Sequence, residues 1–282
     1  MLAVLIALVF TPPSVAPVVE EFELKSKVFG NTRTIRVVVP PDYSTYKASS
    51  KKVPVFYVLD GIMSFHGIGY PETVTRLQRE GKAKPFLTVL VDNGASTRES
   101  KSNHDRSNEY LPFPDVGFPG QLYPPNPAKP EGSKHPSFLI QDVMSEVESR
   151  YSVAKGPENT AIAGYSYSGV AALYASWNRP DVFGTAIVES APFWIGEDFA
   201  LLKYGEARER WPSALYVAHG GRESDWKPTQ EMHDLLTIRL RDFVGKHHPK
   251  TRTEFFRDPT GQHNPPSWKA RLERAILFAF GK

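Results

Sequence analysis

One serine lies in a sequence that is typical of a tight strand-to-helix turn. Residues 164–169 read G-Y-S-Y-S-G and lie between an apolar run and a helical pattern. A nucleophilic serine on such a turn needs small residues two positions before and two positions after it, because larger side chains would collide there. For Ser166 these positions hold Gly164 and Ser168, which replaces the usual glycine. Ser168 is the poorer nucleophile candidate, since Val170 would then crowd the turn.

A serine of this kind needs a base and a carboxylate, and both follow it along the chain. In hydrolases with this turn the acid comes after the serine and the histidine comes last. Glu223 and Asp225 both follow the apolar run 214–219, and either could orient an imidazole. His263 lies in a loop with Gly and Pro before the last helical pattern, where the chain order places the base. The sequence predicts Ser166 as nucleophile and His263 as general base, with two alternatives for the acid.

The elements that would position these residues are read from the pattern of apolar residues. Polar and apolar residues alternate over 20–39 around Gly30-Asn31, which predicts an antiparallel hairpin. Apolar runs of strand length then alternate with helical patterns, which is typical of buried parallel strands. Residues 92–136 interrupt this order as a long, polar loop. We expect one α/β domain over 20–282, with a mainly parallel sheet of about eight strands, an antiparallel start and helices on both faces. The expected strands are 53–59, 86–91, 160–163, 184–189, 214–219 and 252–256, and the expected helices are 72–80, 137–151, 169–178, 230–245 and 267–280.

Composition excludes several classes of function. There are 34 Lys and Arg against 31 Asp and Glu, a net charge of +3, and the basic residues are scattered, so we expect no nucleic-acid partner. The chain has no cysteine, which excludes disulfides and thiolate chemistry. It contains neither H-E-x-x-H nor H-x-H, so we predict no metal site and no cofactor.

The first residues resemble a secretory signal. Residues 2–10 are all apolar, and small residues precede a possible cleavage site after Ala16. The run is too short to span a bilayer as a helix, and no other apolar stretch approaches that length. We therefore expect a signal peptide at 1–16 and a secreted or periplasmic protein without a membrane span, the alternative being a cytoplasmic protein.

Several motifs together resemble the putative esterase family of α/β-hydrolases, which includes enterochelin, feruloyl and acetylxylan esterases and S-formylglutathione hydrolase. The resemblance covers nearly the whole chain from residue 20 and is greatest for the enterochelin-esterase branch. It rests on segments of this sequence that begin with Arg36, Val55, Arg106, Ala163, Pro180, Pro192 and His263.

The resemblance implies an α/β-hydrolase fold and a role for each matching residue. Ser166 would be the nucleophile and His263 the base. Glu223 would be the acid if the strand ends at Gly220, and Asp225 stays the alternative. The backbone amides of Tyr167 and Ile62 would form the oxyanion hole.

The implied activity is that of a serine carboxylic ester hydrolase acting through an acyl-enzyme on a small aryl, sugar-linked or siderophore-type ester. A thioesterase, a serine peptidase or a catalytically silent binding protein on the same scaffold are the alternatives. Arg106 either pairs with Glu109 or meets an anionic group of the substrate. Aromatic residues could form a stacking wall or belong to the core; those proposed for substrate binding are Tyr70, Trp194 and Trp226.

Overall fold

An eight-stranded sheet forms the centre of the computed structural model, which describes residues 16–97, 99–100, 105–126 and 129–282. The strand order is β1-β2-β4-β3-β7-β8-β9-β10. The strands are β1 (Val18–Lys25), β2 (Thr32–Val39), β3 (Val55–Leu59), β4 (Leu87–Val91), β7 (Thr160–Tyr165), β8 (Thr185–Glu189), β9 (Ala214–Arg222) and β10 (Arg252–Gln262).

The predicted antiparallel start of the sheet is confirmed. Strands β1 and β2 pair from Val18 opposite Val39 to Lys25 opposite Thr32, and the turn between them contains Gly30 at φ +68°. β2 is also antiparallel to β4, while the six strands from β4 through β3, β7, β8 and β9 to β10 are parallel to one another. The chain therefore has the mainly parallel α/β sheet that the sequence predicts.

The buried strands alternate between two hydrophobic cores, because successive side chains of a strand point to opposite faces. In β3, Val55, Tyr57 and Leu59 belong to one core, while Phe56 and Val58 belong to the other. Both faces are buried, which explains why these strands are continuous apolar runs in the sequence.

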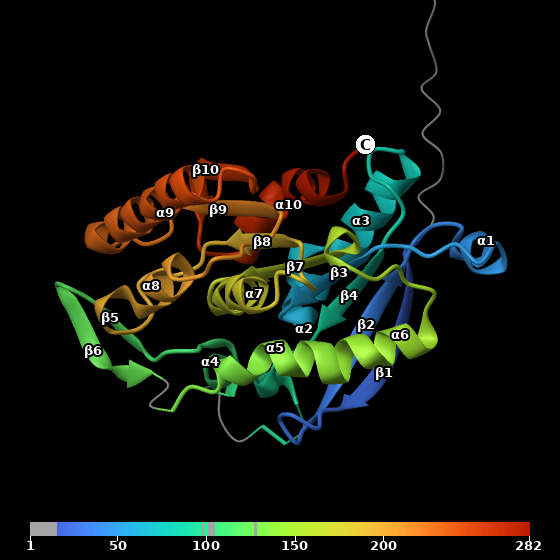
Figure 1. The fold of residues 1–282 in the computed structure, drawn as a ribbon, viewed down its shortest axis with the longest axis horizontal. Helices are drawn as coiled ribbons and strands as arrows, with labels where there is room; N and C mark the ends of the chain where they lie inside the picture. The colour runs from blue at the N-terminus through green and yellow to red at the C-terminus, as the bar shows by residue number, and fades with distance from the viewer. Residues whose placement is uncertain (1–15, 98, 101–104, 127–128) are drawn as a thin grey trace, which may run out of the picture.

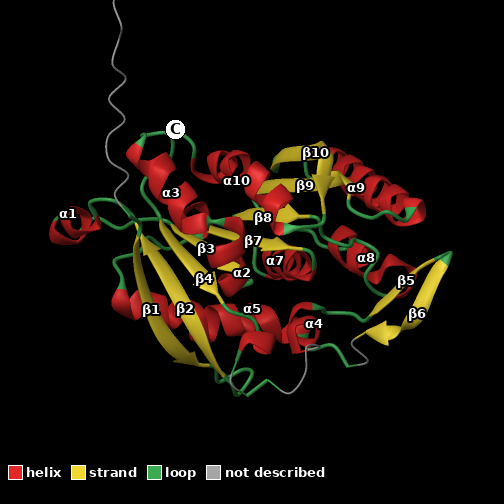
Figure 2. Cartoon of the chain, turned by 180° about the vertical axis from the view of Figure 1, so that it is seen from behind, coloured by secondary structure: helices red, strands yellow, loops and turns green. Residues whose placement is uncertain are grey.

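Helices cover both faces of the sheet (Figures 1 and 2). Helices α5, α6, α7, α8 and α9 contribute to one core, and α3 and α10 to the other. The helices are α1 (Tyr43–Ala48), α2 (Gly61–Met63), α3 (Tyr70–Arg79), α4 (Asp105–Tyr110), α5 (His135–Phe138), α6 (Ser145–Arg150), α7 (Tyr167–Asn178), α8 (Ala200–Glu206), α9 (Lys227–His247) and α10 (Pro265–Phe280). A π-helical stretch, Leu139–Met144, joins α5 to α6, so the single helix expected over 137–151 is one helical segment with a wide turn inside it.

The segment expected as a long loop, 92–136, contains regular structure. It holds α4 and a separate two-stranded sheet of β5 (Asp115–Phe118) and β6 (Gln121–Asn126), which lies away from the main sheet (Figure 1). The pairing is short and has a register shift between Asp115 and Gly117. Two prolines inside β6 conceal it in the sequence, because proline disfavours a strand prediction.

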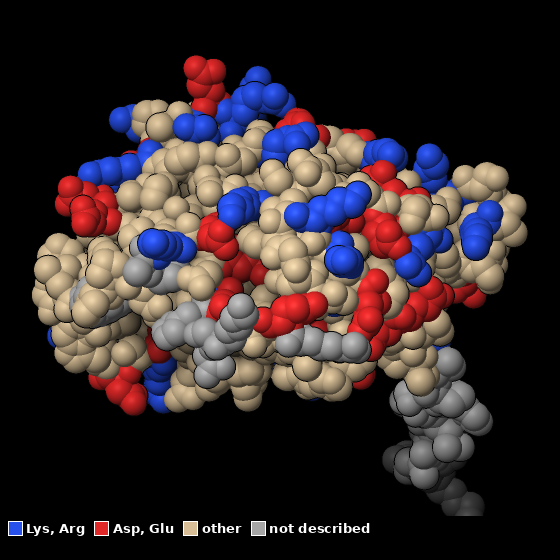
Figure 3. Space-filling view, turned by 90° about the horizontal axis from the view of Figure 1, so that it is seen from below, with Lys and Arg blue, Asp and Glu red and all other residues tan. Residues whose placement is uncertain are grey.

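The molecular surface seen in Figure 3 carries acidic and basic side chains interspersed. Within the described part of the chain, no helix combines the length and the apolar character that crossing a bilayer requires. The predicted signal peptide falls almost entirely on residues 1–15, which lie outside the described residues.

A buried ion pair ties segment 92–136 to the N-terminal hairpin. Arg33 Nη1 lies 2.7 Å from Oε1 of Glu109, and both side chains are nearly inaccessible. The Arg33 guanidinium also lies over the ring of Phe138, 4.2 Å from its centre. Burial tends to raise the pKa of Glu109, but Arg33 and His135 hold it below its usual value.

Replacing Glu109 with Gln should therefore lower the free energy of unfolding by about 3–5 kcal/mol, because Arg33 would be left buried without its counter-charge. Denaturant unfolding at pH 7 measures the change. Glu146→Gln is the control, since its pair with Arg150 is largely exposed and should contribute little. Equal effects of the two substitutions would contradict this account.

Candidate active site

Ser166 lies at the carboxyl end of β7, directly before α7, in a strained backbone conformation. Its φ and ψ are +57° and −127°, which a non-glycine residue adopts only when its surroundings impose it. A Cβ on Gly164 would lie 2.1 Å from the carbonyl oxygen of Ser168, so glycine is required there. The Ser166 amide donates a 2.9 Å hydrogen bond to the carbonyl of Glu189 at the end of β8. The turn thus holds Ser166 half-buried at the edge of the sheet where reactive groups are expected.

Ser168, the departure from the usual glycine, fits inside this turn. Its side chain is fully buried, and its hydroxyl accepts a 2.7 Å hydrogen bond from the Tyr165 amide and donates one of 2.8 Å to the Tyr165 carbonyl. The hydroxyl therefore closes the turn that precedes Ser166 and does not distort it.

His263 and Glu223 are brought together at the same edge. Nδ1 of His263 lies 2.7 Å from Oε2 of Glu223. The Glu223 side chain is buried, while 35% of the His263 side chain is exposed. Asp225, the other predicted acid, is exposed on the following bend. Of the two carboxylates, Glu223 is the one that contacts the histidine.

The other oxygen of Glu223 is held by groups from neighbouring strands. Ser190 Oγ donates a 2.7 Å hydrogen bond to Oε1, and the amide of Gly220 donates to the same atom. Ser190 itself has a φ of +51° and accepts a 3.0 Å hydrogen bond from Nε1 of Trp268. Burial tends to raise the pKa of Glu223, but the hydrogen bonds from His263, Gly220 and Ser190 lower it to about 2.

Trp268 connects the histidine to the serine turn. Its ring lies 5.3 Å from that of His263 and 5.2 Å from that of Tyr165, the residue before Ser166. Trp268 belongs to α10, which begins directly after the His263 loop. The three predicted residues, Ser166, His263 and Glu223, therefore lie at the ends of neighbouring strands around one tryptophan.

The two predicted oxyanion-hole amides are placed differently. Tyr167 is the first residue of α7 and follows Ser166, so its amide lies at the positive end of a helix. The amide of Ile62 donates to the carboxylate of Asp92. Burial raises the pKa of Asp92, and this hydrogen bond reduces the rise. As the structure stands, the Ile62 amide has this carboxylate as its partner.

The predicted pairing of Arg106 with Glu109 is wrong. Arg106 does not pair with Glu109; its Nε and Nη2 lie 2.8 and 2.6 Å from the two oxygens of Asp60. It also donates a 3.4 Å hydrogen bond to the Tyr165 carbonyl. Burial alone would raise the pKa of Asp60, but Arg106, Ser168 and Asn93 hold it below its usual value. A guanidinium engaged in this way joins the ends of β3 and β7, while 27% of the side chain is exposed, so contact with an anionic substrate group stays a prediction.

The three aromatic residues predicted to bind substrate differ in exposure. Tyr70 is completely buried, with its hydroxyl 2.5 Å from that of Tyr165, so the prediction that it contacts substrate is wrong. Trp194 is 7% exposed and packs edge to face on Phe118, with the ring centres 5.4 Å apart, so it belongs to the core. Trp226 is 41% exposed and stacks on Phe118 at 6.0 Å, which leaves its outer face open.

One histidine beside the pair is absent from the predictions. His233 of α9 is 4% exposed, and its ring centre is 6.5 Å from that of His263. Burial lowers its pKa to about 4. The sequence assigned His233 only to a helical pattern, since the spacing carries no sign that this helix face meets the end of β9.

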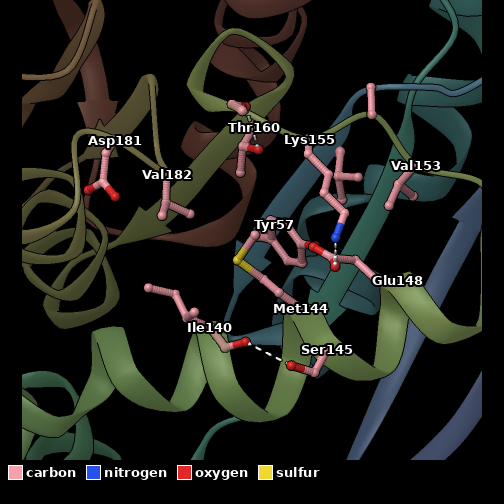
Figure 4. Close-up of a pocket in the computed structure, with 13 residues that line it drawn as sticks. Tyr57, Ile140, Met144, Ser145, Glu148, Val153, Lys155, Thr160, Asp181 and Val182 are labelled. Atoms are coloured by element: carbon pink, nitrogen blue, oxygen red, sulfur yellow. Dashed lines mark hydrogen bonds and ion pairs between the residues drawn. The ribbon is translucent and has the colours of Figure 1, made fainter.

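A separate cavity of about 280 Å³ lies at the amino ends of β3 and β7, at the opposite edge of the sheet (Figure 4). Tyr57, Met144 and Thr160 line it, and its Lys155 and Glu148 side chains form an ion pair of 2.6 Å. The length of β7 separates this cavity from Ser166, so we assign it no part in the chemistry.

Comparisons with known proteins agree with this fold. A sequence model of the family described as "Putative esterase" matches residues 26–279. An iron(III) enterobactin esterase of Dickeya dadantii is 32% identical over 133 residues, which cover 39% of this chain and 31% of that protein. The crystal structure of the enterobactin esterase of Shigella flexneri in the presence of enterobactin has a TM-score of 0.71 and 19% identity, over 95% of this chain and 60% of that one. A ferulic acid esterase of Anaeromyces mucronatus, in complex with ferulic acid, has a TM-score of 0.62 and 22% identity, over 95% and 92% of the two chains. The chain thus spans only part of the length of these enterobactin esterases.

The lowered pKa of Glu223 predicts how the free energy of unfolding changes with pH. A folded-state pKa of about 2, against an ordinary 4.5, stabilises the fold above pH 4.5, and this contribution is lost as the pH falls towards 2. Between pH 7 and pH 3 the parent should lose about 2 kcal/mol more of its free energy of unfolding than Glu223→Gln does. Denaturant unfolding at both pH values measures this. Asp225→Asn should behave as the parent; a parent and a Glu223→Gln protein with the same pH dependence would contradict the prediction.

Proposed function

This chain belongs to the putative esterase family, and we propose that it is a serine carboxylic ester hydrolase with Ser166, His263 and Glu223 as its catalytic residues. The observation that carries the proposal is the strained turn that presents Ser166 at the edge of the sheet where His263 contacts Glu223. This arrangement has the chain order and the roles of a nucleophile, a base and an orienting acid.

The proposed reaction proceeds through an acyl-enzyme. His263 accepts the Ser166 proton as Oγ attacks the ester carbonyl, and then donates that proton to the leaving alcohol. Glu223 accepts the hydrogen bond of Nδ1, which leaves the lone pair of Nε2 for the serine. Water activated by the same histidine then hydrolyses the acyl-enzyme.

The negative charge of the tetrahedral intermediate needs hydrogen-bond donors near Ser166. The amide of Tyr167 is the first donor, because it follows the nucleophile at the start of α7. Ile62 would supply the second if its amide exchanges the Asp92 carboxylate for the substrate oxygen. Arg106 is a positioning residue in this proposal, since it joins Asp60, two residues before Ile62, to the strand that ends at Ser166.

An aryl ester is the substrate class that the side chains around the site favour. From His263 a row of rings leads through the buried His233, Trp194 and Phe118, with successive centres 4.8 to 6.5 Å apart, and supports Trp226, which is exposed. The exposed outer face of Trp226 is available for stacking with a flat ring. Two relatives have structures with enterobactin or ferulic acid, both of which carry aromatic rings. Sugar-linked and other siderophore-type esters remain within this class when they carry an aryl group.

The alternative functions are hydrolysis of a thioester or amide bond, and ligand binding without catalysis. A thioesterase or serine peptidase would use the same residues, so a matched pair of ester and amide substrates separates them. A silent binding protein is disfavoured, because the hydroxyl of Ser168 completes the turn at Ser166.

Loss of Ser166 tests the catalytic assignment. Hydrolysis of p-nitrophenyl acetate, methyl ferulate and a catecholate trilactone should fall by a factor of about 10⁴ or more in Ser166→Ala, because no other group forms the acyl-enzyme. Glu223→Gln should lose a factor of about 10³ or more, while Asp225→Asn keeps the parental kcat/KM. Undiminished hydrolysis by folded Ser166→Ala protein would refute the assignment.

Trp226 tests the substrate class. Trp226→Ala should raise the KM for methyl ferulate by a factor of about 5 to 10 through the lost stacking and leave that for methyl butyrate nearly unchanged. Leu122→Ala is the matched control, because Leu122 is 75% exposed on the neighbouring β6. If both KM values rise together, Trp226 supports the site without recognising an aryl group.

A further inference from the structure

A third side chain completes a group of potential metal ligands at the catalytic edge. One ligand atom each from Glu223, His233 and His263 lie within 4.8 Å of one another. The proposed reaction uses Glu223 and His263 and gives His233 no role. The group comes from three elements, since Glu223 follows β9, His233 belongs to α9 and His263 follows β10.

His233 has an environment unusual for a buried histidine. The residue is 4% exposed, and no hydrogen bond joins its ring nitrogens to the described residues, yet these nitrogens are not among the fully sealed polar atoms without a partner. Its ring packs against Trp194, with the ring centres 4.8 Å apart. A ring nitrogen of His233 reaches within 4.8 Å of a donor atom of both Glu223 and His263. Solvent therefore reaches the point where His233, Glu223 and His263 face one another, and a small ion can reach it as well.

We propose that Glu223, His233 and His263 form a binding site for Zn²⁺ and that the bound ion inhibits the enzyme. The inhibitory part rests on the proposed esterase function, whereas the binding part does not. Two imidazoles and one carboxylate are a donor set typical of zinc, with a fourth position left for water.

The geometry requires only a small rearrangement. Donor atoms around a tetrahedral zinc lie about 3.3 Å apart, so atoms that are now up to 4.8 Å apart must approach by up to about 1.5 Å. If Nδ1 of His263 is the ligand, it must instead move about 0.6 Å away from Oε2 of Glu223, which now lies 2.7 Å from it. His263 can supply this movement, because it lies in a loop and 35% of its side chain is exposed. Oε1 of Glu223 keeps its bonds to Ser190 and Gly220, while Oε2, which faces His263, is the oxygen for the metal.

Inhibition follows from the lone pairs of His263. A neutral imidazole has one nitrogen that carries a proton and one that carries a free lone pair. If zinc takes Nδ1, the ring proton must move to Nε2, which then cannot accept the proton of Ser166. If zinc takes Nε2, the lone pair itself is occupied. In both cases His263 can no longer act as the general base. Zinc binding changes no covalent bond between heavy atoms of the protein, so removal of the metal restores activity.

Zinc binding is measured on Ser166→Ala protein, because this variant needs no activity for the readout. Calorimetric titration should give one Zn²⁺ per chain, and Co²⁺ in its place should give the intense visible absorption of a tetrahedral site. Adding His233→Gln should weaken zinc binding by a factor of at least about 10. His247→Gln is the control, since His247 is an exposed histidine on the same helix.

The inhibition is measured on the parent by comparing ester hydrolysis in zinc with hydrolysis after chelation. Zinc should inhibit the parent reversibly, and Mg²⁺ should not inhibit it. For His233→Gln, half-inhibition relative to the activity of the same variant after chelation should need a zinc concentration at least about tenfold higher than for the parent. If the parent binds no zinc, or binds it as tightly with His233→Gln, the site is refuted. Activation by zinc refutes inhibition. Zinc binding in a protein that cleaves no ester supports the site and counts against the proposed function.

Discussion

The hydrogen bond from Nδ1 of His263 to Oε2 of Glu223 is the interaction on which the arrangement of the site depends. It joins the loop after β10 to the loop after β9, and each partner is held by another strand. Ser190, at the end of β8, donates to the second oxygen of Glu223. The Ser166 amide reaches back to the carbonyl of Glu189, which precedes Ser190. Ser166, His263 and Glu223, the proposed nucleophile, base and acid, are therefore fixed relative to one another by the ends of four adjacent strands.

Buried charged pairs join neighbouring strands at this edge of the sheet. Arg271 lies 2.8 Å from Glu189, and burial, together with the nearby Glu223, still raises the pKa of Glu189 to about 7. Arg106 and Asp60 form the corresponding pair on the other side of Ser166. Buried pairs of this kind contribute little net stability, but removing one partner is costly. They make the positions of β3, β7 and β8 depend on one another, which is what a preorganised site requires.

The sequence predicts the sheet well because its strands are buried on both faces and are continuous apolar runs. Ser166 and His263 could be predicted as nucleophile and base because the turn requires Gly164 and the chain order leaves one suitable histidine. Local sequence could not choose between Glu223 and Asp225, since both are carboxylates after the same strand and only the fold buries one of them.

Other features of the site depend on contacts between distant segments. Nothing near Arg106 in the sequence indicates that its partner is Asp60 and not Glu109. Tyr70 is an aromatic residue of the kind that often binds ligands, but in the fold its side chain is buried in the core. The position of His233 near His263 could not be predicted either, because the two residues come together only when α9 packs beside β9. Burial and long-range pairing therefore limit what the sequence can predict about this site.

The most direct test of this account is the reaction of the protein with a fluorophosphonate, followed by mass spectrometry of its peptides. A catalytic unit of Ser166, His263 and Glu223 predicts one adduct per chain, located on Ser166, that forms much more slowly in Glu223→Gln than in Asp225→Asn. An adduct on Ser168 or another serine, or labelling of Ser166 at the same rate in Glu223→Gln as in the parent, would contradict it.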